Sequence, residues 1–209
     1  YDTQQRDKVW EEIAQPAADA VGVGVMGLGV LGRDAAEKLK LLGFDVAGWS
    51  RTEKDIPGIA CFHGSEGLTP FLARTDILVA LLPLTPDTEG LIDHRLLSGL
   101  RTNNHMGGAV LINAGRGRLQ VEADILRSLA EGNLSGATLD VFQQEPLAPE
   151  SPFWTHPKVT VTPHIAAVSD PDYLCSYILR QIEAFEAGHR LENVVDRKPG
   201  YCRPLIPSY

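Results

Sequence analysis

Short runs of Val, Ile and Leu alternate with amphipathic segments along most of the chain. Bounded by Gly and Pro, such runs are typical of buried β-strands. They cover residues 21–26, 45–49, 59–62, 76–82, 109–114, 137–142 and 159–163. The segments between them predict helices over residues 31–42, 66–73, 93–100, 122–131 and 170–187. Because a parallel sheet covered on both faces has continuous apolar strands separated by helices, the pattern predicts a doubly wound α/β fold.

The two ends of the chain depart from this alternation. Residues 5–18 predict a helix with a thin apolar stripe, and the last predicted helix has an apolar face that we expect to pack against the sheet. The stripe contains Trp10, Ile13, Ala14 and Ala17, and the face contains Leu174, Ile178, Ile182 and Phe185. We therefore expect an N-terminal arm helix within residues 1–19, an α/β domain over 20–193 and an irregular tail over 194–209.

Composition and charge narrow the classes of partner. The 209 residues are 44% hydrophobic, which is enough for a sizeable core, and the formal net charge is −8. Since no run of Lys and Arg is longer than a pair, neither nucleic acid nor an anionic membrane is expected as the main partner.

The N-terminus and the cysteines indicate the compartment. The first residues, YDTQQRDKVWEE, are too polar for a signal peptide, and no window has the roughly 18 uninterrupted apolar residues of a membrane span. Cys61, Cys175 and Cys202 are widely spaced and form no CxxC pair, which favours a reducing cytoplasm. Because an initiator Met is lacking, we expect the chain to be a fragment or a trimmed form.

Three glycines, Gly27, Gly29 and Gly32, lie between the first strand and the helix that follows it. In this setting the first makes the tight turn, the second lets the backbone approach a pyrophosphate, and the third permits close helix packing. The amides around Val30 and Leu31 add hydrogen-bond donors and the positive end of the helix dipole. The pattern predicts a Rossmann-type dinucleotide-binding domain; the alternative is a tight turn that binds no ligand.

The end of the second strand indicates which dinucleotide is bound. An NAD-binding strand normally ends in Asp or Glu, which accepts hydrogen bonds from the adenosine ribose. Here the strand ends in Ser50, Arg51 and Thr52, so no carboxylate repels a 2′-phosphate and a guanidinium is available to bind it. We expect NADP(H) to be preferred over NAD(H). The alternative is that Arg51 is a solvated loop residue and that Glu53 binds the ribose.

Three ionisable residues, Arg116, Glu145 and His164, follow the ends of three successive strands. Because the carboxyl ends of parallel strands form the rim of the ligand crevice, we expect these residues to converge there. Hydride transfer to a carbonyl needs a cation that polarises the oxygen, as Arg116 can, and an acid that protonates it, as His164 can. A carboxylate such as Glu145 beside the imidazole would orient the ring and keep a proton available near neutral pH.

Each of these three residues also has a structural interpretation when it is taken singly. The His can be a packed or capping residue, the Arg can contact only a carbonyl, and the Glu can belong to a turn. The other histidines lack a position at this rim, and none has the spacing of metal ligands, so we expect no metal site. They are His63, His94, His105, His156 and His189.

The chain resembles the nucleotide-binding domain of the D-isomer-specific 2-hydroxyacid dehydrogenases, and within that family the glyoxylate/hydroxypyruvate reductases. The resemblance extends from about residue 20 to residue 196 in the order of the family. It rests on the segments GLGVLG, GWSRT, LLPLTPDTEGLI, LINAGRGRLQVEADIL, GATLDVFQQEPL, SPFWTHPKVTVTPHIAA and ENVVDR.

The resemblance implies a role for each matching residue. Arg116 would contact the substrate carboxylate and carbonyl, and Glu145 and His164 would form the acid/base pair. Further cofactor contacts would come from Leu82 and Pro83 near the adenosine, from Ala114 and Gly115, and from Asp140 at the nicotinamide end. The implied reaction transfers hydride from NADPH to a small 2-keto acid. The family also implies a homodimer formed through this domain and its leading arm.

Three segments depart from the family pattern. The family's substrate domain precedes the glycine turn, whereas only a short predicted helix precedes it here, so the expected cleft lacks one wall and the chain alone is expected to turn over poorly. The entry into the fifth strand, residues 101–108, is a few residues longer than usual. The last dozen residues match nothing in the pattern, and we expect the tail to reach toward the substrate domain.

Two other functions remain open at the level of sequence. One is a dinucleotide-responsive binding protein of the corepressor kind, in which turnover is incidental. The other is an NAD-linked dehydrogenase of the phosphoglycerate type. The complete set Arg116, Glu145 and His164 argues against the first, and the Ser-Arg-Thr strand ending argues against the second.

Overall fold

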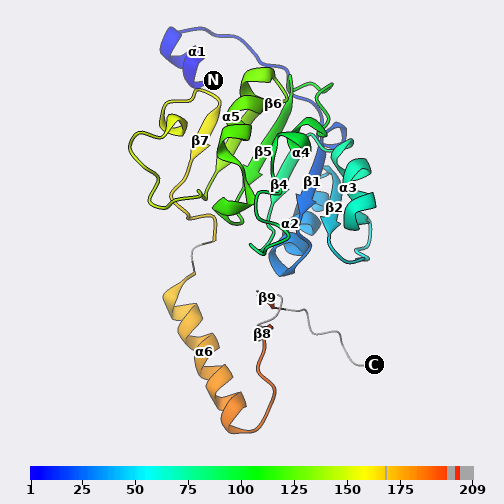
Figure 1. Ribbon diagram of the computed structural model, residues 1–209, viewed down its shortest axis with the longest axis vertical. Coiled ribbons are helices and arrows are strands. Elements are labelled where there is room, and N and C mark those ends of the chain that lie inside the picture. Colours follow the sequence, from blue (N-terminus) through cyan, green and yellow to red (C-terminus); the bar gives the residue numbers. More distant parts are fainter. Residues whose placement is uncertain (168, 197–200, 203–209) are drawn as a thin grey trace.

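A seven-stranded parallel sheet forms the centre of the molecule (Figure 1). The computed structural model describes residues 1–167, 169–196 and 201–202. The strand order is β3-β2-β1-β4-β5-β6-β7. The strands are β1 Gly22–Met26, β2 Asp45–Ser50, β3 Ala60–His63, β4 Ile77–Ala80, β5 Ala109–Asn113, β6 Leu134–Leu139 and β7 Val159–Val161. The predicted doubly wound α/β fold is therefore confirmed.

Helices α2 to α6 lie close to their predicted positions, and the segment that follows β7 separates α6 from the sheet (Figure 1). They are α1 Asp2–Asp7, α2 Val30–Leu41, α3 Gly64–Leu72, α4 His94–Ser98, α5 Glu122–Glu131 and α6 Pro171–Glu186. Short 3₁₀ turns occur at Ala18–Ala20, Gly117–Leu119 and Pro152–Trp154, and β8 Val195–Asp196 pairs with β9 Tyr201–Cys202. No helix among the described residues is long and apolar enough to cross a membrane.

Alternating side chains of the central strands build a core on each face of the sheet. Met26 of β1 packs with residues of α3, α4 and α5, whereas its neighbour Val25 packs with Ala36 of α2. Both strand residues are fully buried, and β1 lies between β2 and β4 in the sheet. Because β1 is enclosed on both faces, all five of its residues are buried, which explains its unbroken apolar sequence.

The direction of winding changes at β1. From β1 the chain passes to β2 and β3, which lie on one side of β1 within the sheet, and then crosses to β4 on the other side of β1. In open α/β sheets, ligands bind at the carboxyl ends of the strands at such a switch point. The glycine turn follows β1 and therefore lies at this point.

The predicted helix over residues 5–18 is wrong in its extent. The helix α1 ends at Asp7, Lys8 adopts a left-handed conformation with a φ of 57°, and the chain from Val9 to Ala17 is not helical. Trp10 is fully exposed and Ile13 is 45% exposed. Short helices need tertiary packing to be stable, and the apolar stripe of this segment has nothing to pack against among the described residues.

The predicted packing of the last helix against the sheet is also wrong. Helix α6 begins as expected, because Asp170 accepts hydrogen bonds from the amides of Asp172 and Tyr173 and Pro171 occupies the first turn. The helix then extends away from the sheet, on the side opposite α1 (Figure 1). Its apolar side chains, including those of Ile182 and Phe185, are exposed.

The loop at residues 101–108 is anchored by Asp76, a carboxylate at the start of β4 whose side chain is only 2% exposed. It accepts hydrogen bonds from the amide of Gly22 at 2.7 Å, from Asn104 Nδ2 at 3.1 Å and from the guanidinium of Arg101. Burial opposes ionisation of Asp76, but these donors outweigh it and hold the pKa of the carboxyl below its usual value. The loop is thus tied to the amino ends of β1 and β4.

Candidate functional site

The glycine turn has the geometry of a pyrophosphate cradle. A side-chain carbon at Gly32 would lie 1.7 Å from the carbonyl oxygen of Gly27, and one at Gly27 would lie 2.8 Å from the Leu81 backbone. Both glycines are therefore required by packing. A side-chain carbon at Gly29, the residue before α2, would meet nothing within 4 Å, so that side of the turn is open to a ligand.

The first helical residues complete this cradle. Val30 and Leu31 are apolar but 71% and 63% exposed, and their amides belong to the first turn of α2. The first amides of a helix have no partner within the helix and carry partial positive charge. An anion placed beside Gly29 would satisfy them.

The end of β2 lies beside the glycine turn, because Met26 pairs with Trp49 in the sheet register. Ser50 is buried and its hydroxyl donates to the carbonyl of Thr52 at 2.7 Å, which shapes the turn that carries Arg51. Arg51 and Thr52 are exposed. Of the three predicted residues, Ser50 therefore uses its hydroxyl within the turn, whereas the side chains of Arg51 and Thr52 are at the surface.

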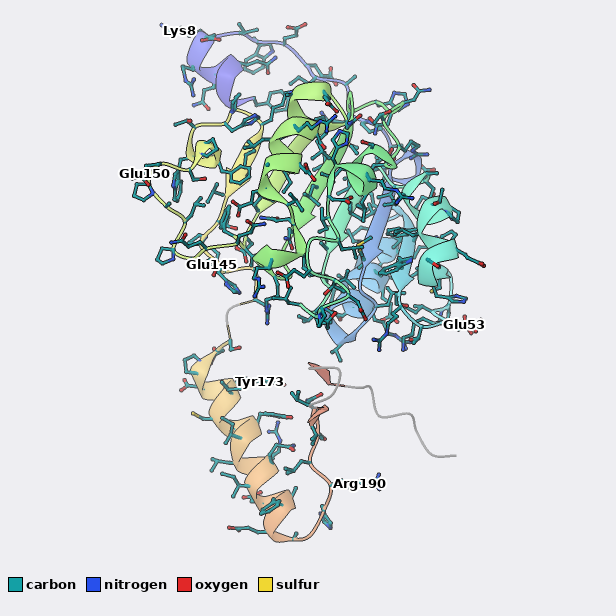
Figure 2. All side chains as sticks on the ribbon, viewed as in Figure 1. Lys8, Glu53, Glu145, Glu150, Tyr173 and Arg190 are labelled. Atoms are coloured by element: carbon teal, nitrogen blue, oxygen red, sulfur yellow. The ribbon has the colours of Figure 1, made fainter. Side chains whose placement is uncertain are left out.

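A cavity of about 560 Å³ lies next to this end of β2. It is lined by residues 61–67, and His63 pairs with Ser50 in the sheet register. Figure 2 shows Glu53 and Glu145 along the same edge of the sheet. A dinucleotide lying along this edge would therefore pass from β2 across β1 and β4 to β5 and β6.

Four predicted cofactor residues gather past the ends of β4 and β5. Leu82 is buried, Pro83 follows it, and the amide of Ala114 donates to the carbonyl of Ala80 at 3.3 Å. A side-chain carbon at Gly115 would lie 3.1 Å from the carbonyl oxygen of Leu82. These two backbone segments are thus in contact beside the glycine turn.

Arg116 follows this contact and is exposed. Its Nη1 donates to the carbonyl of Gly115 at 2.7 Å. The next residue must be glycine, because a side-chain carbon at Gly117 would lie 1.8 Å from the carbonyl oxygen of Phe142. The loop that carries Arg116 therefore packs directly on the loop that follows β6.

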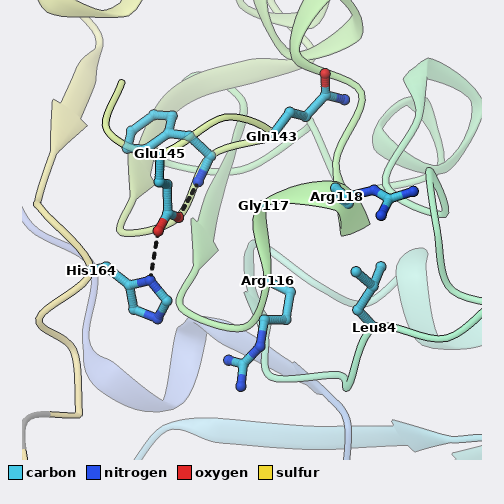
Figure 3. Close-up of a pocket in the computed structure, with 8 residues that line it drawn as sticks. Leu84, Arg116, Gly117, Arg118, Gln143, Glu145 and His164 are labelled. Carbon is cyan, nitrogen blue, oxygen red and sulfur yellow. Dashed lines mark hydrogen bonds and ion pairs between the residues drawn. The ribbon is translucent and has the colours of Figure 1, made fainter. Parts of the chain in front are cut away.

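Glu145 and His164 form a hydrogen-bonded pair. The imidazole Nδ1 lies 2.8 Å from Glu145 Oε2, and Glu145 Oε1 accepts from the amide of Phe142 at 2.9 Å (Figure 3). Burial raises the pKa of Glu145, but the hydrogen bonds from His164 and Phe142 outweigh it and hold the pKa below its usual value. The carboxylate is therefore charged at neutral pH, and the Nε2 of His164 faces away from it (Figure 3).

Asp140 holds the segment that carries His164. Its buried carboxylate accepts hydrogen bonds from the hydroxyl of Thr162 and from the amides of Ile165 and Ala166, both at 2.9 Å. Burial opposes ionisation, but these donors outweigh it and lower the pKa of Asp140. His164 itself has a left-handed backbone, with a φ of 56°, which turns its side chain toward Glu145. The contact expected between Asp140 and the nicotinamide stays a prediction.

One cavity of about 260 Å³ brings Arg116, Glu145 and His164 together (Figure 3). Its other lining residues are Leu84, Gly117, Arg118, Phe142 and Gln143. These five residues were not predicted from the sequence, although each follows the same strand ends as the predicted residues. Position after a strand was thus the signal that could have identified them.

The glycine turn lies at the switch point of a parallel sheet, and a cation, a carboxylate and an imidazole surround one cavity at the same edge. This arrangement defines a Rossmann-type dinucleotide-binding domain. The sequence model of the D-isomer specific 2-hydroxyacid dehydrogenase NAD binding domain matches residues 1–166, and the chain belongs to this family.

Relatives of known structure and function agree with the family. Glyoxylate/hydroxypyruvate reductase A of Yersinia enterocolitica is 42% identical over 201 residues, which are 96% of this chain and 63% of the relative. The NADPH-dependent glyoxylate/hydroxypyruvate reductase of Sinorhizobium meliloti, solved with NADP and sulfate, is 52% identical with a TM-score of 0.93 and has the same coverages. A probable 2-hydroxyacid dehydrogenase of Rhizobium etli, solved with NADP, HEPES and L(+)-tartaric acid, is 51% identical, with a TM-score of 0.91 and the same coverages. The chain thus spans somewhat under two thirds of the length of these relatives.

Proposed function

We propose that this chain is the NADP(H)-binding domain of a reductase that converts a small 2-keto acid into the 2-hydroxy acid. The observation that carries the proposal is the single cavity that Arg116, Glu145 and His164 share, on the same sheet edge as the glycine turn. The relatives named as NADPH-dependent reductases support the choice of coenzyme and reaction.

The residues at the glycine turn and at β2 fit the coenzyme. The open side of Gly29 and the first amides of α2 would hold the pyrophosphate, and Arg51 with Thr52 would bind the 2′-phosphate. The bound coenzyme supplies the hydride. Arg116 would bind the substrate carboxylate and polarise the keto oxygen, which a bidentate guanidinium does well.

His164 would donate the proton. Its Nδ1 is held by Glu145, and its Nε2 is available to protonate the keto oxygen as negative charge develops there. The Glu145 carboxylate would hold the ring in the orientation that presents Nε2 to the cavity. The aliphatic and aromatic side chains of Leu84 and Phe142 in the same cavity would limit water around the reacting carbon.

Glyoxylate and hydroxypyruvate are the proposed substrates, from the names of the relatives. We also propose the division of the chain into an arm over residues 1–19, the coenzyme domain over 20–193 and a tail over 194–209. Dimerisation through the coenzyme domain and its arm is proposed from the family alone.

Steady-state oxidation of NADPH with glyoxylate or hydroxypyruvate tests the proposal, in the full-length protein with the family's substrate domain present. We expect turnover with at least one of them, and a loss of about a hundredfold or more in kcat for His164→Ala, because the proton donor is removed. His105→Ala is the matched control, since that exposed histidine lies in the loop before β5, at the opposite edge of the sheet. No turnover in either protein, with NADPH still bound, would favour the dinucleotide-responsive binding protein instead.

A further inference from the structure

Two fully buried amides, Asn113 and Gln120, lie behind the cavity without lining it. Asn113 ends β5, and Gln120 follows the 3₁₀ turn at Gly117–Leu119. Asn113 Nδ2 donates to Gln120 Oε1 at 2.8 Å. A buried amide is costly unless its groups are paired, so such a pair specifies one local arrangement.

The side-chain amide of Asn113 forms hydrogen bonds to the backbone before and after the Arg116 side chain. Asn113 Oδ1 accepts from the amide of Gly115 at 3.0 Å, and Asn113 Nδ2 also donates to the carbonyl of Arg116 at 3.2 Å. The backbone on either side of the guanidinium-bearing residue is therefore bonded to one buried side chain.

The second amide holds the loop that leads to Glu145. Gln120 Nε2 donates to the carbonyl of Val141 at 3.1 Å, and the backbone carbonyl of Gln120 accepts from Gln143 Nε2 at 2.8 Å. Between these two contacts lies Phe142, whose amide donates to Glu145 Oε1. A continuous set of hydrogen bonds thus runs from the Arg116 loop through the amide pair to Glu145 and then to His164.

We propose that Asn113 and Gln120 are positioning residues that set the spacing between Arg116 and the Glu145–His164 pair. The inference rests on the proposed function, because it concerns where the anchoring cation stands relative to the proton donor. Misplacement of such groups by about 1 Å can lower a rate by roughly a hundredfold. The pair is fully buried outside the lining of the cavity, so it would act through the two loops.

Gln120→Met is the decisive variant, since methionine has a similar length and lacks both amide functions. We expect kcat/KM for the keto acid to fall at least tenfold while the Kd for NADPH changes less than twofold. Gln120→Glu keeps an acceptor for Asn113 Nδ2, and its protonated form also keeps a donor for Val141, so it should retain more activity than the Met variant. It also provides a second test if the Met variant does not fold.

Thr75→Val is the matched structural control. Thr75 is a buried residue whose hydroxyl donates to the carbonyl of Phe71 at 2.7 Å, at the amino end of β4 and away from the cavity. We expect this variant to lower the urea midpoint as Gln120→Met does while leaving kcat/KM within twofold of wild type. An equal fall in kcat/KM in the two variants, or no fall in the Met variant, overturns the inference.

Ring-nitrogen NMR of His164 separates this inference from the proposed function. Absence of turnover in the full-length wild-type protein contradicts the proposed function but leaves the ring signals readable. Gln120→Met should move the Nδ1 signal toward its value in Glu145→Gln, and Thr75→Val should leave it in place. An unchanged Nδ1 signal in the Met variant would show that the amide pair does not position the histidine.

Discussion

At the scale of single residues, the function depends on side chains whose state their neighbours set. Glu145 is charged because the hydrogen bonds from His164 and the Phe142 amide outweigh its burial. Ser50 donates its hydroxyl to its own turn, so in the proposed function Arg51 and Thr52 are the residues that would bind a 2′-phosphate. The charge of Glu145 and the hydrogen bond of Ser50 do not follow from residue type alone, because each depends on the atoms that lie within hydrogen-bond reach.

Arg51→Ala should weaken NADPH binding by about tenfold to a hundredfold, since a charge-assisted hydrogen bond contributes about 1.5–3 kcal/mol. NADH binding should change little, because NADH lacks the 2′-phosphate. Calorimetric titration with each coenzyme measures both. Arg95→Ala, which removes an exposed cation of α4, is the control and should leave both affinities unchanged. Equal losses for NADPH and NADH would contradict the proposed contact.

At the scale of elements, the cavity is built by the packing of one loop on another. Gly117 lets the loop after β5 lie against Phe142, and the Asp140 carboxylate ties the segment after β7 to the end of β6. At the other edge of the sheet, Asp76 joins β1, β4 and the loop at 101–108. The extra residues of that loop therefore have a structural partner.

Asp76→Asn should lower the free energy of unfolding at pH 7 by about 1.5–3 kcal/mol, because it removes the charge of a buried carboxylate that pairs with the 35% exposed Arg101. Since the folded state lowers the pKa of Asp76, its stabilising effect is present above the usual pKa of a carboxyl group. That effect is lost as the pH falls through the lowered pKa, so the two proteins should become similar in acid.

Urea unfolding of both proteins between pH 7 and pH 3 measures this difference. Asp34→Asn is the matched control, because Asp34 pairs with Lys38 on the exposed face of α2. This variant should lower the free energy of unfolding by less than about 1 kcal/mol at any pH. A constant difference between wild type and Asp76→Asn across the pH range would refute the linkage.

At the scale of the whole molecule, stability resides in the sheet and its covering helices. The fully buried side chains belong to the segments between β1 and the 3₁₀ turn at Pro152–Trp154, whereas the apolar face of α6 is exposed. Helix α6 is amphipathic and well capped, yet it contributes little to this core.

Phe185→Ser in α6 should change the free energy of unfolding of the sheet by less than about 0.5 kcal/mol, because its side chain is 69% exposed. Leu129→Ala in α5 is the comparison and should cost about 2–5 kcal/mol, since Leu129 is only 2% exposed and the change creates a cavity. Thermal and urea unfolding, followed by the fluorescence of the buried Trp49, measure both. A large loss in the α6 variant would show that this face is buried in solution.

Hydrophobic periodicity determined much of this protein without reference to the structure. The strands and the sheet class follow from local patterns, because a strand enclosed on both faces must be apolar throughout. Arg116, Glu145 and His164 could be selected because residues that follow parallel strands meet at one edge, and the three residues line one cavity.

Only the tertiary structure decided which groups touch and which faces are covered. The extent of α1 and the exposure of α6 were predicted wrongly, because an amphipathic pattern identifies an apolar face but not the surface that buries it. The hydrogen bonds from Asn113 to Gln120, from Gln120 to Val141 and from Ala166 to Asp140 join residues 7, 21 and 26 positions apart in the chain. Hydrogen bonds of this kind leave no periodic trace in a sequence, since their geometry exists only after the strands have paired.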